Sequence, residues 1–118
     1  MNKIQKIAGV LSSQEILELI HKNVITSENG IEKDLIQPAS IDLRLGIKAW
    51  RVPASFLPGK GHKVSSRLKD LAMHEFSLID GAVLECGCVY IVKLLENISL
   101  TDNLTGIANP KSSTGRLD

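Results

Sequence analysis

Residues 111–116, Lys-Ser-Ser-Thr-Gly-Arg, bring hydroxyl groups, a flexible glycine and two cations together near the end of the sequence. Pro110 precedes them and is expected to end any strand before it, because proline has no N–H and a fixed φ. A turn of this composition can direct N–H groups, hydroxyls and a guanidinium toward one concave spot, which suits a polyphosphate. The spacing is not that of a Walker A loop. A solvated Ser/Thr turn with a salt-bridged arginine is the structural alternative, and residue types alone leave both open.

A second polar cluster lies in residues 36–46, where Ser40, Asp42 and Arg44 alternate with aliphatic residues. This alternation has the period of a strand with one aliphatic and one polar face. Asp42 and Arg44 would be neighbours on the polar face and could pair there. The polar face is either solvated or meets another subunit or a ligand.

Composition bounds the class of protein. The 118 residues suffice for one domain or part of one, with an aliphatic core because only 3% are aromatic. A net charge of +1 gives no electrostatic reason to bind nucleic acid or a membrane, and the few aromatics disfavour a base-stacking surface. No stretch has the character of a signal peptide or a transmembrane helix. Cys86 and Cys88 lack the spacing of a zinc site, and we expect two reduced cysteines in a cytoplasmic protein.

Residues 1–24 contain the clearest signal for a single element. Residues 1–9 are expected to form a flexible arm, and 10–24 to carry a helix. Ser12 and Glu15 have the spacing of a capping box, in which each side chain accepts a hydrogen bond from the other residue's backbone N–H. The helix itself is therefore predicted at Ser13–His21, with an apolar stripe that begins at Ile16 and reaches Val24.

From residue 36 onward the pattern predicts a β domain, either a sandwich or a barrel, with one short helix that Ser65 or Ser66 would cap. A phase slip past Gly46 predicts a bulge, and Asp80-Gly81 predicts a hairpin turn. The residues His74 and Glu75 are expected in an exposed linker. The later strands are predicted at 82–85, at 88–94 as a buried central strand, and at 104–108 before the terminal loop.

Two motifs, in this order, resemble those of dCTP deaminases. Residues 38–46 resemble the family's first motif, and 111–117 resemble its central motif, Arg-Ser-Ser-Leu-Ala-Arg-Leu. Between them, 84–88 and 95–100 are similar to the family's Pro-Gly segment and its Leu-Glu-x-x-x-Leu-Pro run. Residues 108–118 are most similar to the longer dCTP deaminases of alphaproteobacteria.

The resemblance implies the distorted jelly-roll β-barrel of the trimeric dUTPase type, with a short N-terminal helix and a short mid-chain helix. Residues 1–118 would then be a single, incomplete domain whose barrel portion is 36–118. The family's active sites lie between subunits of a homotrimer, which would put Ser40, Asp42 and Arg44 at a subunit interface. The family hydrolyses dCTP to dUTP and ammonia without zinc, and Mg²⁺ enters with the triphosphate.

The resemblance also implies roles for single residues. Ser112 matches the serine that positions the attacking water near cytosine C4, and Arg116 matches the arginine that stabilises the developing charge. Lys111 and Ser113 match positions that hold the triphosphate, although Lys111 replaces the usual arginine and so loses bidentate geometry. Thr101 stands where proline is common. The general base of the family is a glutamate that would follow Asp118, so this chain is expected to be inactive by itself and to be the front part of a longer domain.

Two other functions remain open at this point. One is a dUTPase-type pyrophosphatase, or a bifunctional enzyme that deaminates dCTP and then releases pyrophosphate. A dUTPase usually carries Arg-Ser-Gly in the central motif, so that Lys111-Ser112-Ser113 favours a deaminase. The other is a non-catalytic module that binds nucleotides.

Overall fold

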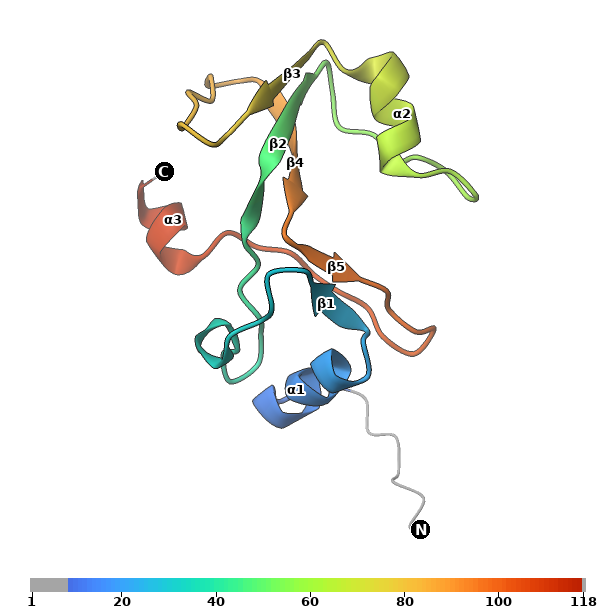
Figure 1. Cartoon of the computed structure of the whole chain (residues 1–118), viewed down its shortest axis with the longest axis vertical. Coiled ribbons are helices and arrows are strands. Elements are labelled where there is room, and N and C mark those ends of the chain that lie inside the picture. Colours follow the sequence, from blue (N-terminus) through green and yellow to red (C-terminus); the bar gives the residue numbers. More distant parts are fainter. Residues whose placement is uncertain (1–8, 118) are drawn as a thin grey trace. The chain divides into compact units, whose positions relative to one another are not determined.

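The structure is a computed structural model that describes residues 9–117, with the backbone alone for 115–117. The chain forms two compact units, one from residues 9–43 together with 96–117 and the other from Arg44–Leu95 (Figure 1). The second unit is therefore one continuous segment, Arg44–Leu95, which lies in the sequence between the two segments of the first unit and is called the excursion below. The expected antiparallel sheets and short helices are both present.

Helix α1 (Ser13–His21) has the predicted bounds and the predicted capping box. The Ser12 hydroxyl accepts a hydrogen bond from the Glu15 N–H at 3.3 Å, and Glu15 Oε1 accepts one from the Ser12 N–H at 3.1 Å. Ile16 on the inner side of the helix is buried. The local signal was sufficient here because capping depends only on residues within one turn.

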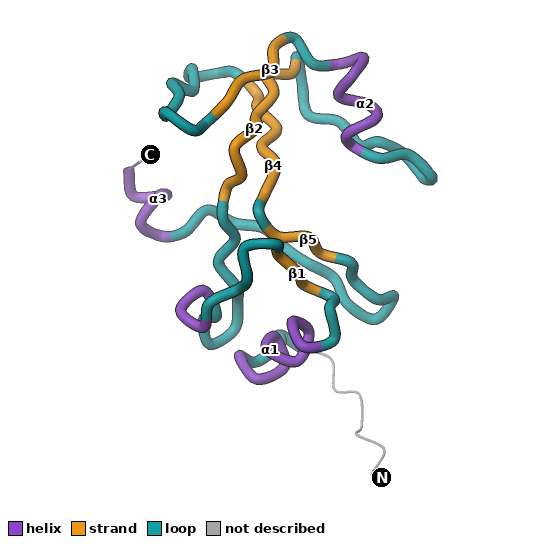
Figure 2. Tube along the Cα trace, in the orientation of Figure 1, coloured by secondary structure: helices purple, strands orange, loops and turns teal. Residues whose placement is uncertain are grey.

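Strand β1 (Ile25–Ser27) pairs antiparallel with β5 (Glu96–Ile98), so that two segments far apart in the sequence lie side by side (Figure 2). Ile25 faces Ile98 in the register and is buried. The sequence analysis missed β1, because the apolar residues up to Val24 also fit helical spacing and hide the end of the helix.

The expected strand through Ser40, Asp42 and Arg44 does not form. The 3₁₀ helix η1 (Lys33–Leu35) leads instead into a loop that a single antiparallel bridge closes, between Ile36 and Ile41. Pro38 interrupts backbone pairing because it has no N–H to donate. After this loop, regular strand structure resumes only with β2 (Leu45–Val52), which belongs to the other unit.

The expected strand at 104–108 is also absent, and helix α3 (Ser112–Leu117) replaces the expected terminal loop. Gly106 in the middle of the segment lowers its strand propensity, and no neighbouring strand pairs with it among residues 9–117. A turn begins at Thr101, where the Leu104 N–H donates to the Thr101 carbonyl.

The unit Arg44–Leu95 contains a three-stranded antiparallel sheet in the order β3-β2-β4, with β3 at His74–Ser77 and β4 at Val89–Leu94 (Figure 2). Helix α2 (Val64–Leu71) completes it. The buried apolar residues of this unit are Ala49, Val52 and Leu68, which come from β2 and α2. The predicted bulge lies in β2, where the pairing with β4 shifts register between Leu45 and Ala49.

Several details of this unit differ from the prediction. His74 and Glu75 belong to β3 and pair with β2, and α2 begins after Lys63 without a side-chain cap. Strand β4 is an edge strand and is mostly half-buried, because β2 occupies the central position. Residues 82–85 form no strand, although the predicted turn at Gly81 forms with a φ of 82°.

A backbone hydrogen bond joins the two ends of the excursion. The Leu95 N–H donates to the Arg44 carbonyl at 2.9 Å, which joins the first and last residues of this unit.

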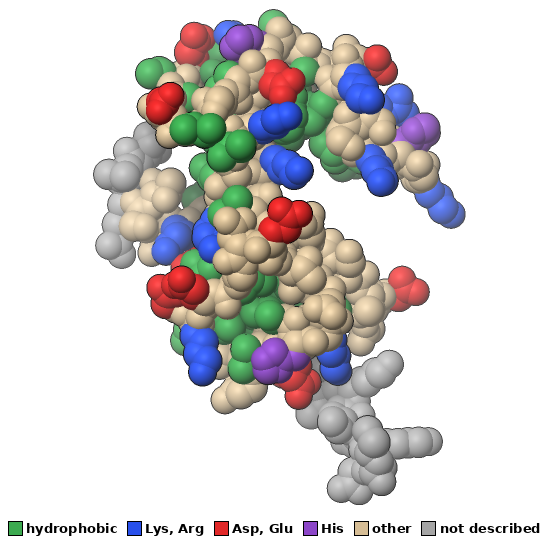
Figure 3. Space-filling model, viewed as in Figure 1, with side chains coloured by type: hydrophobic (Ala, Val, Ile, Leu, Met, Phe, Trp, Pro, Cys, Tyr) green, Lys and Arg blue, Asp and Glu red, His purple; other side chains and the backbone are tan. Residues whose placement is uncertain are grey.

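Hydrophobic side chains reach the surface in both units (Figure 3). In the part of the chain described, 15 large hydrophobic residues are exposed and only five hydrophobic residues are buried. The buried core is small for a chain of this length.

Candidate functional site

The central motif forms the start of α3. Lys111 directly precedes the helix, and Ser112 and Ser113 occupy its first two positions with exposed side chains. Positions 112 and 116 are therefore about one helical turn apart along the backbone. The side chain of Arg116 lies outside the described part of the structure.

Lys111 connects the two motifs that the sequence analysis singled out. Its Nζ atom lies 3.0 Å from Oδ2 of Asp42, in an ion pair within the unit that contains both chain ends. The Asp42 side chain is 17% exposed and that of Lys111 is 62% exposed. The pair thus joins a nearly buried carboxylate to a mostly solvated ammonium.

The loop of the first motif fixes the position of this carboxylate. The Asp42 N–H donates to the Leu35 carbonyl, and the Gln37 N–H donates to the Ser40 carbonyl, both at 2.8 Å. The side-chain amide of Gln37 adds a hydrogen bond of 3.2 Å from Nε2 to Asp42 Oδ2, and another of 3.2 Å to the Asp34 carbonyl. Asp42 is therefore held by backbone and side-chain contacts that do not involve Lys111.

Gln37 is the residue of this cluster that sequence reasoning missed. It lies beside Pro38 in the motif that drew attention, but glutamine gives no catalytic or charge signal of its own. Its role becomes visible only once the loop brings positions 37 and 42 together.

The other two residues of the expected polar face are Ser40 and Arg44. Ser40 is exposed and takes part through its backbone carbonyl. Arg44 is half-buried and belongs to the other compact unit. The prediction of one continuous polar strand face is therefore wrong, because the chain turns at Pro38 and changes unit after Leu43.

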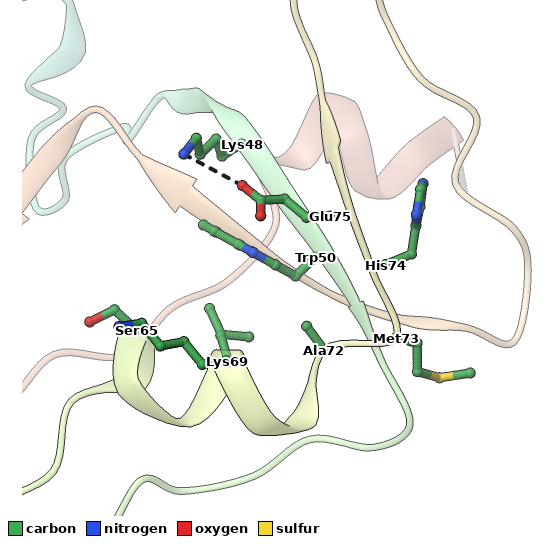
Figure 4. Close-up of a pocket in the computed structure, with 9 residues that line it drawn as sticks. Lys48, Trp50, Ser65, Lys69, Ala72, Met73, His74 and Glu75 are labelled. Carbon is green, nitrogen blue, oxygen red and sulfur yellow. Dashed lines mark ion pairs between the residues drawn. The ribbon is translucent and has the colours of Figure 1, made fainter.

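A hollow of about 570 Å³ lies in the unit Arg44–Leu95. In Figure 4 the indole of Trp50 lies between strand β2 and helix α2, near the ion pair that joins Lys48 Nζ to Glu75 Oε1 at 3.4 Å. A second hollow of about 340 Å³ shares Lys48 and Glu75. Neither is lined by the residues that the sequence analysis assigned to the site.

Residues 9–117 offer no cluster of three or more His, Cys, Asp or Glu side chains that could hold a metal ion. Cys86 and Cys88 are both free thiols. In the same part of the chain, no helix has the length and apolar character needed to cross a membrane.

The Lys111 cluster offers donors that suit an anion. Lys111 has an ammonium with several N–H donors, of which the Asp42 carboxylate uses only part, and the next two residues carry exposed hydroxyls. Phosphate oxygens are the acceptors that such a group of donors binds best.

Comparison with known proteins identifies the family of the chain. The family described as the 2'-deoxycytidine 5'-triphosphate deaminase (DCD) N-terminal domain matches residues 7–118. The crystal structure of 2'-deoxycytidine 5'-triphosphate deaminase from Agrobacterium tumefaciens is 51% identical and superposes with a TM-score of 0.82 over 93% of this chain. The chain spans about a third of the length of that enzyme, 33%. No curated protein matches the sequence.

Proposed function

Because the chain belongs to the family of dCTP deaminase N-terminal domains and shares the dUTPase-type fold of the solved deaminase, we propose that it takes part in the deamination of dCTP to dUTP and ammonia. The observation that carries the proposal is the structural match at 51% identity over 93% of the chain, and the family match at residues 7–118 includes both polar motifs. A dUTPase-type or bifunctional pyrophosphatase would share the fold, but the central motif favours the deaminase.

In the proposed reaction, a water oxygen forms a bond to C4 of cytosine and the bond from C4 to the exocyclic nitrogen breaks. The nitrogen leaves as ammonia after it takes up a proton. Ser112 would position the water, and Arg116 would stabilise the negative charge that develops in the transition state. Helical spacing between positions 112 and 116 supports a shared task for the two residues.

Lys111 and Ser113 would hold the triphosphate in this proposal. Both side chains are exposed next to the start of α3, and Lys111 brings the positive charge that the phosphates require. Mg²⁺ would enter bound to the phosphate oxygens as part of the substrate, so that no protein ligand is assigned to it.

Assembly into a homotrimer is also part of the proposal. The many exposed hydrophobic residues support it, since an apolar surface of this extent favours coverage by further protein. Two free cysteines support a reducing compartment, and we assign the protein to the cytoplasm. A net charge of +1 gives no electrostatic argument for nucleic acid or a membrane as a partner.

The 118-residue chain is expected to bind dCTP without turning it over. The reaction needs a base to take the proton of the attacking water. Asp42 is the carboxylate that the structure gives to the central motif, and it is already engaged by Lys111 and Gln37. We assign no glutamate of this chain to the role of the base.

The test measures binding and turnover separately. Isothermal titration with dCTP and Mg²⁺ should give saturable heat that dATP, a purine nucleotide with the same phosphates, does not reproduce. Ammonia release from dCTP by the same chain should remain at the background rate. Absence of dCTP binding would contradict the proposed nucleotide site. Ammonia release at the rate of a complete deaminase would contradict the expectation that this chain binds dCTP without turning it over. Pyrophosphate release from dUTP would favour the pyrophosphatase.

A further inference from the structure

We infer that Asp42 is a positioning residue that holds the Lys111 ammonium ready for the nucleotide's phosphates, an inference that rests on the proposed function. Asp42 itself would not touch the phosphates. It would act through the ion pair of 3.0 Å that joins its Oδ2 atom to Lys111 Nζ.

The Asp42 carboxylate, which accepts from Lys111, is fixed by its loop. The loop around Asp42 is closed by the bridge between Ile36 and Ile41 and by the hydrogen bond from the Asp42 N–H to the Leu35 carbonyl. Its carboxylate is 17% exposed and also accepts from Gln37 Nε2. An acceptor held in this way can define a position for a flexible partner.

Lys111 is a flexible side chain that needs such a partner. Its side chain is 62% exposed and carries a flexible stem, so an unpaired ammonium would sample many rotamers and lose that freedom when phosphate binds. The carboxylate uses one of several N–H donors and leaves the others for phosphate. Pairing in the free protein therefore reduces the entropy that binding must supply.

Removing the Asp42 carboxylate could in principle either strengthen or weaken the binding of phosphate, so the direction of the change in affinity distinguishes two roles. A carboxylate near a triphosphate repels it, and removing this charge alone should strengthen binding. Positioning predicts instead that removing the carboxylate weakens binding, and only while Lys111 is present.

The main experiment compares the dCTP affinity of the wild-type chain with that of Asp42→Asn by titration calorimetry in Mg²⁺. We expect a loss of about threefold, equivalent to about 0.7 kcal/mol, in line with one half-exposed ion pair. Asp34→Asn is the matched control, because it removes the same charge from the neighbouring helix η1 and leaves the Lys111 pair intact. Its affinity should equal that of the wild type.

The same substitution is then made in a Lys111→Met background. Positioning predicts that Asp42→Asn has no weakening effect there, whereas a role in maintaining the loop would weaken binding equally in both backgrounds. Deoxycytidine, which has no phosphates, should bind all variants with the same affinity in an NMR titration. Circular dichroism verifies that every variant folds.

The outcomes separate the two proposals. A wild-type chain that does not bind dCTP contradicts the proposed function and with it the role of Asp42. A wild-type chain that binds dCTP, combined with an Asp42→Asn variant of unchanged or higher affinity, overturns the positioning role alone. Equal losses with and without Lys111 also overturn it.

Discussion

Substituting Gly46 by alanine should destabilise the sheet of the unit Arg44–Leu95. Gly46 lies in the bulged part of β2, and a β-carbon built on it would be 2.6 Å from the Lys93 carbonyl oxygen and 3.4 Å from the Lys93 carbonyl carbon. Real β-carbons essentially never approach another heavy atom within 3.0 Å. The neighbour is backbone in β4, so no side-chain rotation can relieve the clash.

The cost follows from the two ways in which the chain can respond. Forcing an extra methyl group into a packed position costs about 1–3 kcal/mol. Opening the end of the β2–β4 ladder instead would lose one or two hydrogen bonds, each worth about 0.5–1.5 kcal/mol. Alanine also lowers the entropy of the unfolded chain, which returns about 0.4–1 kcal/mol. The net loss in the free energy of unfolding should therefore be about 1–2 kcal/mol.

Urea denaturation followed by fluorescence measures this loss, because the single tryptophan, Trp50, lies in β2 itself. Gly106→Ala is the control, since a β-carbon there would meet only Leu100 Cδ1 at an ordinary 3.7 Å. The control should stay within about 0.5 kcal/mol of the wild type. Equal stability of Gly46→Ala and Gly106→Ala would refute the claim that close backbone approach requires glycine at position 46.

Three smaller changes test other contacts. Ser12→Ala removes the α1 cap and should lower stability by about 1 kcal/mol, seen as a lower thermal midpoint in circular dichroism; an unchanged midpoint would mean that the capping box contributes nothing. Tyr90→Phe removes the hydroxyl that accepts the Glu85 N–H at 2.9 Å and should cost about 0.5–1 kcal/mol in urea denaturation, less if water replaces it. Breaking the exposed Lys48–Glu75 pair by Glu75→Gln should change the free energy of unfolding by less than about 0.5 kcal/mol, and a larger loss in the same assay would show that this pair is stronger than an ordinary surface pair.

Local signals predicted the parts of the fold that local chemistry decides. The capping box gave the bounds of α1, the phase slip past Gly46 gave the bulge, and Gly81 gave a turn. Each of these features depends on residues within a few positions of one another. The dUTPase-type fold class came from the resemblance, and the solved deaminase agrees with it.

The errors concern partners that lie far away in the sequence. Whether 104–108 becomes a strand depends on a neighbour to pair with, and whether β4 is central depends on where β2 and β3 lie. Alternation from Ile41 to Leu45 satisfied the period of a strand, but Pro38 and the bridge of Ile36 with Ile41 produced a loop. Periodicity reports which faces are apolar and does not identify the partner strand.

The candidate site divides in the same way. Residue types and the resemblance identified the two polar motifs that contain Asp42 and Lys111. Nothing in the sequence predicted that these two side chains form an ion pair with each other. Asp42 was expected beside Arg44, its neighbour on a strand. The pairing of Asp42 with Lys111, and the support from Gln37, required the loop to be folded.

In the sequence, β1 precedes and β5 follows the segment Arg44–Leu95. Strand β1 therefore has no pairing partner until that whole segment has been synthesised. The three strands of the sheet β3-β2-β4 all lie within Arg44–Leu95, so their pairing partners are synthesised before β5. Evolution can also lengthen or shorten it at little cost, since doubling a closed loop costs only about 0.6 kcal/mol. Natural insertions and deletions in related chains should therefore be concentrated between Arg44 and Leu95, the two residues that a backbone hydrogen bond joins.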